Sequence, residues 1–262
     1  MSKSLQDKVA LITGAGSGIG KAAALKLATE GAQIALLGRT ADELDETADE
    51  VAALGMDALE LVADISDPVA IRKAFAKLKA DYSSLDILVA NAGVNGTWAP
   101  LEQIKLEEWD QTQAINVRGT FLTIQEALPL LKKSGGVISV VASVNGTRIF
   151  SNTGATAYSC SKAAQVAMTK MLAVELGPFK VRINVICPGA ISTNIDENTN
   201  QRNVEQVKIP VEFPKGAIPL TKDQPGKPED VAELIWFLSS DHARHITGSE
   251  IYIDGAQSLL QG

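Results

Sequence analysis

A tyrosine and a lysine lie four residues apart in the stretch TAYSCSKAA, at positions 158 and 162. The stretch contains no helix breaker, and residues four apart in a helix lie on one face, one turn from each other. A nearby ammonium favours the phenolate, so Tyr158 beside Lys162 predicts a phenol that exchanges protons with a substrate oxygen. The alternative is an ordinary helix with a half-buried tyrosine beside a solvated lysine, and the rest of the chain has to decide between them.

A glycine-rich turn, TGAGSGIG (13–20), directly follows an apolar run and precedes a helix-like stretch. In that context Gly14 makes the tight turn, Gly18 lets the backbone approach a pyrophosphate, and Gly20 lets helix and strand pack closely. The amides at the start of the helix would point at the anion. The turn therefore predicts a dinucleotide-binding site, although its spacing is G-x-x-x-G-x-G rather than G-x-G-x-x-G.

The second apolar run ends in LLGRT (36–40), where an acidic residue would select NAD by binding the ribose hydroxyls. Gly38 takes that place and Arg39 follows, which favours NADP because an arginine can bind a 2′-phosphate. The alternative for Arg39 is a solvated side chain at the start of a loop. Asp64, at the end of the third run, could accept a hydrogen bond from the adenine amino group or cap the next turn.

Apolar runs alternate with amphipathic stretches along the chain, and the runs are rich in Val, Ile and Leu with little alternation, as in parallel strands covered on both faces. We expect strands at 9–14, 33–38, 58–64, 86–93, 136–143, 181–189 and 249–255. We expect helices at 19–30 before Gly31, from a Thr40/Glu43 capping box to about Gly55, from Asp67-Pro68 onward, and at 228–240. This rhythm predicts an α/β, Rossmann-like doubly wound parallel sheet of about seven strands in three α/β/α layers, and a single domain over 1–262.

One segment, 194–228, departs from this rhythm. It is polar, has weak periodicity and carries four prolines, at positions 210, 214, 219 and 225. A long segment of this kind after a strand is typical of a substrate-binding loop or lid, and the alternative is a loose surface excursion.

Composition excludes several classes of function. The chain of 262 residues is 45% hydrophobic with a net charge of −7, and no face-sized cluster of Lys and Arg predicts a nucleic-acid partner. Cys160 and Cys187 form no CxxC pair, and His242 and His245 have no convincing acidic or thiol partner, so no metal site is expected. No signal peptide or run of membrane-spanning length is recognisable, and we expect a cytoplasmic protein that does not bind membranes.

Together these motifs resemble the short-chain dehydrogenase/reductase family over nearly the whole chain, from Lys8 to about Gly255. The glycine turn, ANAG (90–93), INVRG (115–119), the serine of VVAS (140–143), the Tyr-x-x-x-Lys pair and CPG (187–189) match the family's motifs in order. The resemblance implies four catalytic residues: Asn116, Ser143, Tyr158 and Lys162. It implies cofactor contacts from Gly14, Ser17, Gly18, Ile19, Gly20, Arg39, Asp64, Ile65, Asn91, Gly93, Tyr158, Lys162, Pro188, Gly189 and Thr193.

Two features depart from the family pattern. Ser143 and Tyr158 are fifteen residues apart, a little wider than usual, and the extra residues fall within NGTRIFSNTGA (145–155). The terminal motif reads DGA (254–256) where DGG is common.

The resemblance implies an oxidoreductase that interconverts a ketone or aldehyde and a secondary alcohol, with NADP (NADPH) preferred and NAD possible. Tyr158 would be the acid/base, Lys162 would lower its pKa, and Asn116 would hold a water on a proton path. The partners implied are a small carbonyl or alcohol substrate and further copies of the chain in a homotetramer. The alternatives are a 3-oxoacyl-thioester (acyl-carrier-protein) reductase and a non-catalytic dinucleotide-binding sensor or scaffold.

Overall fold

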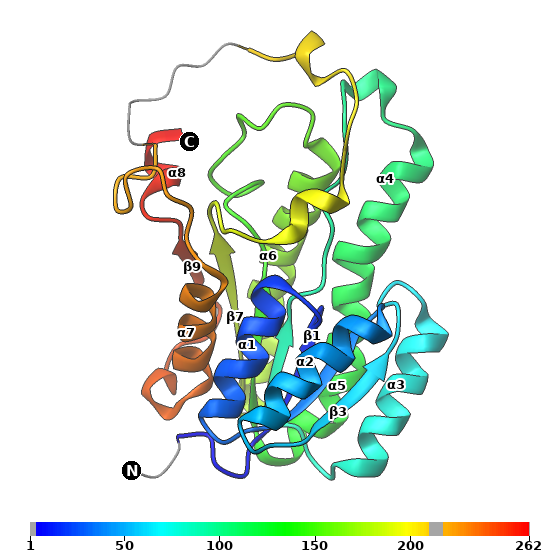
Figure 1. The fold of residues 1–262 in the computed structure, drawn as a ribbon, viewed down its shortest axis with the longest axis vertical. Coiled ribbons are helices and arrows are strands. Elements are labelled where there is room, and N and C mark those ends of the chain that lie inside the picture. Colours follow the sequence, from blue (N-terminus) through cyan, green and yellow to red (C-terminus); the bar gives the residue numbers. More distant parts are fainter. Residues whose placement is uncertain (1–3, 210–216, 262) are drawn as a thin grey trace.

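A seven-stranded parallel sheet forms the centre of the computed structural model, which describes residues 4–209 and 217–261 (Figure 1). Its strands run in the order β3-β2-β1-β4-β6-β7-β9, and every neighbouring pair is parallel. The strands are β1 (Val9–Thr13), β2 (Gln33–Gly38), β3 (Ala58–Val62), β4 (Ile87–Ala90), β6 (Gly136–Val141), β7 (Val181–Pro188) and β9 (Glu250–Ile253). All seven predicted strands, and the predicted fold class, are confirmed.

Helices cover both faces of this sheet (Figure 1). The helices of the described residues are α1 (Gly18–Thr29), α2 (Ala41–Ala53), α3 (Pro68–Asp81), α4 (Leu106–Gln113), α5 (Thr120–Ser134), α6 (Thr156–Leu176), α7 (Pro228–Ser239) and α8 (Gln257–Gln261). Alternate strand residues enter two separate cores: Leu11 joins the one that contains Phe75 of α3, while Ile12 joins the one that contains Leu27 of α1. The near-continuous apolar runs of the sequence are explained by this burial on two faces.

The predicted helix boundaries are confirmed where backbone geometry decides them. Asp67 caps α3 by accepting hydrogen bonds from the amides of Val69 and Ala70. Gly31 follows α1 with a φ of 97°, which a glycine adopts without strain. The predicted capping box at Thr40 is wrong: Thr40 precedes α2, but its side chain makes no capping hydrogen bond to the described residues.

The strand order reverses between β1 and β4, and the carboxyl ends of these strands border the crevice where such sheets bind ligands. A second, two-stranded parallel sheet lies beyond this edge. It joins β5 (Gly96–Trp98), which follows β4, to β8 (Thr199–Gln201) within the predicted lid. Neither strand was predicted. Residues 210–216 of the predicted lid lie outside the described residues.

Candidate active site

Tyr158 and Lys162 lie on one face of α6, as their spacing predicts, and both are buried. The Nζ of Lys162 is 5.5 Å from the centre of the Tyr158 ring. It donates a hydrogen bond of 3.1 Å to the carbonyl of Val141, at the end of β6. The lysine is therefore directed toward the carboxyl edge of the sheet rather than into solvent.

Asn116 connects a neighbouring turn to the helix that carries the pair. It lies in a π-helical turn, Ala114–Gly119, between α4 and α5, and its side chain is completely buried. Its Nδ2 donates to the carbonyl of Val94 and to Ser161, each at 2.9 Å, while its Oδ1 accepts from the amide of Val94. Single π-helical turns are frequent at functional sites, and this one turns an amide inward against α6.

Ser143 follows β6 and lies within hydrogen-bonding reach of the Tyr158 hydroxyl. Its Oγ accepts a hydrogen bond of 3.1 Å from the backbone amide of Asn145, which leaves the hydroxyl hydrogen available to donate. The structure thus brings together all four side chains that the family resemblance nominates, from β6, α6 and the π-helical turn.

The ionisation of the pair differs from the expectation. Burial raises the pKa of Tyr158 to about 12, and the hydrogen bond from Ser143 opposes this only in part. Burial also lowers the pKa of Lys162 to about 8. The predicted lowering of the Tyr158 pKa by its lysine neighbour is therefore wrong for the chain by itself, because removal from water raises this pKa by more than the hydrogen bond from Ser143 lowers it.

The glycine turn has the shape of an anion cradle. Gly14 and Gly18 have φ values of 64° and 52°, in the left-handed region. A Cβ on Gly20 would lie 2.0 Å from the carbonyl oxygen of Gly14, so only glycine permits this approach. Ser17 occupies the N-cap of α1, and Ile19 packs in the first turn of the helix. The residues present therefore fit a dinucleotide pyrophosphate at the start of α1.

The ANAG segment (90–93) lies between the glycine turn and the Tyr158–Lys162 pair. Asn91 donates from Nδ2 to the carbonyls of Thr13 and Gly14, at 3.0 and 3.3 Å, and so holds the end of β4 against the glycine turn. A Cβ on Gly93 would lie 3.5 Å from the Nζ of Lys162. This distance places the backbone of Gly93 beside the lysine.

The segment after β7 lies next to the glycine turn. A Cβ on Gly18 would lie 3.2 Å from Cγ2 of Thr193, so this threonine borders the glycine turn. Pro188 ends β7, but Gly189 faces the C-terminal segment instead: a Cβ there would lie 2.7 Å from Cβ of Asp254.

The region expected to hold the adenosine contains charges of both signs. Arg39 is exposed, and Asp64 accepts hydrogen bonds from the amide and hydroxyl of Ser66, so Asp64 caps a turn. Ile65 is buried against Gly119. A Cβ on Gly16 would lie 2.9 Å from Oε2 of Glu43, which puts a carboxylate beside the glycine turn.

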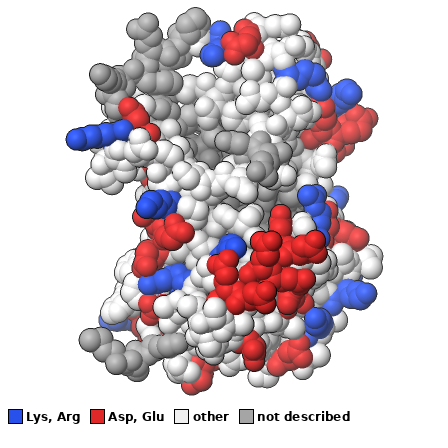
Figure 2. Space-filling model, viewed as in Figure 1, with Lys and Arg blue, Asp and Glu red and all other residues white. Residues whose placement is uncertain are grey.

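Acidic side chains gather around Glu43 on the exposed face of α2 (Figure 2). They are Asp42, Glu43, Asp45, Glu46, Asp49 and Glu50. A hydrogen bond with Asp45 raises the pKa of Glu60 on β3, which shows that negative charges crowd there. This face disfavours an acidic macromolecule as a partner.

Two residues that support the site were not predicted from the sequence. Ser161 donates to the carbonyl of Tyr158 at 2.7 Å and accepts from Asn116, so it links α6 to the π-helical turn. Thr13 accepts from the amides of Asn91 and Ala92, each at 3.0 Å, and joins β1 to the ANAG segment. The signal for Ser161 was its position three residues after Tyr158, on the same helical face.

Within residues 4–209 and 217–261, no group of three or more His, Cys, Asp and Glu side chains is placed to hold a metal ion. Over the same residues, no helix combines the length and the apolar character needed to cross a bilayer.

The site combines a glycine cradle with a tyrosine–lysine pair, and the two lie across the switch point of a parallel sheet. This combination defines the class of oxidoreductases that use a nicotinamide dinucleotide. Comparison with known proteins narrows the class. A family model described as enoyl-(acyl carrier protein) reductase matches residues 14–256. The chain belongs to the short-chain dehydrogenase/reductase family, and it is an oxidoreductase acting on CH–OH or C=O groups.

Two curated relatives illustrate the range of this family. The 3-oxoacyl-[acyl-carrier-protein] reductase FabG of Thermotoga maritima is 37% identical over 252 residues, which cover 96% of this chain and 98% of that protein. The 3beta-hydroxysteroid dehydrogenase of Mediterraneibacter gnavus is 33% identical over 261 residues, which cover 95% of this chain and 94% of that protein. The two names specify different substrates at nearly the same identity.

Solved structures agree on the fold. A 3-ketoacyl-ACP reductase from Sinorhizobium meliloti 1021 is 56% identical, with a TM-score of 0.93 over 96% of this chain and 99% of that chain. A 3-ketoacyl-(acyl-carrier-protein) reductase from Brucella melitensis, solved with NADH, is 33% identical with a TM-score of 0.85 over 97% and 100%. A short chain dehydrogenase from Burkholderia cenocepacia, solved with NADP, is 33% identical with a TM-score of 0.83 over 96% and 98%. Both dinucleotides therefore occur in chains of this fold.

Proposed function

We propose that the protein reduces a small ketone or aldehyde, and oxidises the corresponding secondary alcohol, with Tyr158 as the acid and base. The observation that carries this proposal is the buried group formed by Tyr158, Ser143 and Lys162 at the carboxyl edge of the sheet. A phenol whose pKa is about 12 is protonated at neutral pH and can donate to a carbonyl oxygen. Ser143 would orient that oxygen.

The dinucleotide would be held by the glycine cradle, by Thr193 and by the space beside Gly93 and Lys162. When bound, it would supply or accept the hydride. Asn116 would fix the π-helical turn against α6, because its Nδ2 and Oδ1 are engaged with Val94 and Ser161. A water held by Asn116 on a proton path remains a proposal.

We propose NADP as the preferred cofactor, because Arg39 is exposed at the end of β2, where a 2′-phosphate would lie. Glu43 beside Gly16 opposes that preference by placing a negative charge near the same phosphate. NAD therefore remains a usable cofactor.

A second candidate is reduction of a 3-oxoacyl thioester, which the names of the Thermotoga maritima and Sinorhizobium meliloti proteins favour. The acidic face over α2 disfavours an acidic carrier protein at that side of the molecule (Figure 2). A small thioester, free of a carrier, remains compatible with both observations.

A further part of the proposal is a cytoplasmic homotetramer. Exposed apolar side chains support self-association: Met171 and Val174 on α6 are 75% and 82% exposed, and Phe121 on α5 is 45% exposed. The two free cysteines, Cys160 and Cys187, are compatible with a reducing compartment. Light scattering tests the assembly, and a monomer in solution contradicts it.

The activity is tested by oxidation of NADPH with a panel of ketones, aldehydes and 3-oxoacyl thioesters. Thioesters of acyl-carrier protein and of a short thiol should be compared at equal concentration. The proposal expects turnover of a free carbonyl compound. Dinucleotide binding without turnover of any compound would instead support a sensor or scaffold, and a strict need for the carrier would support the second candidate.

A further inference from the structure

Trp98 faces the catalytic tyrosine candidate. The centres of the Trp98 and Tyr158 rings are 6.5 Å apart, with an angle of 37° between the ring planes. The indole N–H of Trp98 donates to the carbonyl of Asn95 at 3.3 Å, which fixes the orientation of the ring. A carbonyl compound hydrogen-bonded to the Tyr158 hydroxyl would place one substituent toward this indole.

The position of Trp98 depends on the lid. Trp98 ends β5, a strand outside the central sheet whose only strand partner among the described residues is β8. The two strands pair in register from Gly96 with Thr199 to Trp98 with Gln201. The amide of Arg202, the next lid residue, donates to the carbonyl of Trp98 at 2.9 Å.

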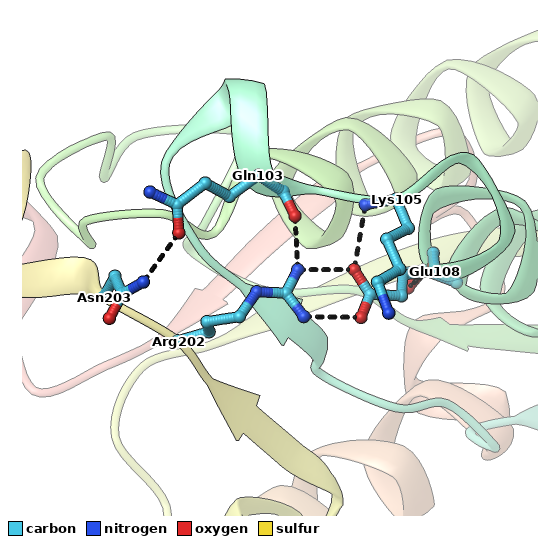
Figure 3. Close-up of polar contacts among 6 residues, drawn as sticks. Gln103, Lys105, Glu108, Arg202 and Asn203 are labelled. Atoms are coloured by element: carbon cyan, nitrogen blue, oxygen red, sulfur yellow. Dashed lines mark hydrogen bonds and ion pairs between the residues drawn. The ribbon is translucent and has the colours of Figure 1, made fainter.

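An ion pair between Arg202 in the lid and Glu108 on α4 attaches the lid to that helix (Figure 3). The guanidinium of Arg202 donates to both carboxylate oxygens of Glu108, at 2.9 and 2.8 Å, and also to the carbonyl of Gln103. The same carboxylate accepts from the amide of Lys105 at the start of α4. The hydrogen bond from Arg202 lowers the pKa of Glu108 to about 2. Two-point pairing of this kind fixes geometry as well as distance.

Neighbouring polar contacts strengthen the attachment. Asn203 donates to Oε1 of Gln103 at 2.8 Å (Figure 3), and Asn95 donates to Oγ1 of Thr199 at 2.7 Å. On the other side, the amide of Ala99 donates to the carbonyl of Gly154, in the widened loop before α6. The strand that carries Trp98 is therefore held between the lid and this loop.

We propose that Trp98 is a specificity-determining residue that selects carbonyl compounds with a flat, apolar substituent, and that Arg202 and Glu108 position it through the lid. This inference rests on the proposed role of Tyr158. An indole face favours aromatic over short aliphatic substituents, because it offers a large apolar surface with a preferred stacking geometry. Arg202 and Glu108 act by position: their ion pair holds the residue that follows β8 against α4, and the amide of Arg202 then binds the carbonyl of Trp98.

The experiment compares an aryl methyl ketone with a short aliphatic methyl ketone, as the ratio of their kcat/KM values at saturating NADPH. Trp98→Ala should lower this ratio about tenfold or more, and Trp98→Phe should retain most of it. Arg202→Met should lower the ratio in the same direction, with the larger change in KM of the aryl ketone and a smaller one in kcat. The double variant Glu108→Arg with Arg202→Glu should recover part of the loss.

The matched control is Lys208→Met, which removes an exposed ion pair with Glu205 in the same lid. It should leave the ratio unchanged. The NADPH dissociation constant should equal that of the wild type in every variant. An unchanged ratio in an active Trp98→Ala variant overturns the assignment of Trp98. A loss of ratio in Lys208→Met equal to that in Arg202→Met overturns the positioning role. Wild-type inactivity toward both ketones overturns this inference alone, whereas the proposed function is overturned only when the wild type turns over no free carbonyl compound of the panel.

Discussion

Replacing Lys162 by methionine should make the protein more stable at neutral pH while it removes activity. Burial lowers the pKa of Lys162 from 10.5 to about 8, so the folded chain binds this proton less tightly than the unfolded chain does. At 1.36 kcal/mol per pH unit, the ammonium costs the folded state about 3 kcal/mol at pH 7. The variant also loses the hydrogen bond to the carbonyl of Val141, which is worth about 1 kcal/mol. The net gain in the free energy of unfolding is therefore about 2 kcal/mol.

The sign of the pH dependence follows from the same pKa values. Because the folded pKa lies below the unfolded one, the penalty is complete below pH 8 and disappears as the pH rises toward 10.5. At pH 9.5 it is about 1 kcal/mol, so the gain from Lys162→Met should fall to about zero.

Urea unfolding of wild type and variant at pH 7 and pH 9.5 measures this difference. Lys170→Met is the control on the same helix, since pairing with Glu250 raises the pKa of Lys170 and its loss should destabilise rather than stabilise. A Lys162→Met protein that is less stable than wild type at pH 7, or a gain that persists unchanged at pH 9.5, would contradict a destabilising buried ammonium.

Three further predictions concern the cofactor and the lid. Arg39→Asp should lower the NADPH-to-NADH ratio of kcat/KM at least about tenfold, and an unchanged ratio contradicts the proposed 2′-phosphate contact. Gly20→Ala should abolish dinucleotide binding in a fluorescence titration, because its Cβ would lie 2.0 Å from a carbonyl oxygen, whereas Gly177→Ala should bind normally because its Cβ would meet no described heavy atom within 4 Å. The stabilisation from Glu108, complete above pH 4.5, should be lost as the pH falls from 4.5 toward 2. Glu108→Gln should therefore lose less stability than wild type between pH 5 and pH 3, and equal losses contradict the pairing.

The central sheet was predictable because its signals are local. Each strand is an apolar run bounded by charged or small residues, and Gly31 and the Asp67-Pro68 pair mark helix boundaries by backbone geometry alone. The Tyr158–Lys162 face was predictable for the same reason, since a helix fixes the relation of residues four apart.

The second sheet was not predictable, because nothing in its sequence is periodic. The segments GTW (96–98) and TNQ (199–201) are three residues long and mostly polar, and their pairing joins positions about a hundred residues apart. The Arg202–Glu108 ion pair spans 94 residues. Such contacts follow from the path of residues 199–202 in space, which no local pattern encodes.

The pKa of Tyr158 shows a related limit. Sequence reveals that Lys162 is a neighbour, and that alone predicts a lowered pKa. It does not reveal that both groups are buried, and in the structure burial is the larger effect. The missing capping bond of Thr40 is a smaller case, in which residue type and position were right but the side chain made no capping bond.

We propose that the Tyr158 hydroxyl transfers the proton, and the variant Tyr158→Phe provides the test. The variant keeps the ring beside Trp98 and removes only the oxygen. NADPH oxidation should be followed in single-turnover experiments with the carbonyl compound that the wild type reduces fastest, alongside NADPH binding by fluorescence. We expect the variant to have a rate lowered by about 10²–10⁴-fold, with an NADPH affinity changed less than about twofold. A rate like that of the wild type would contradict it.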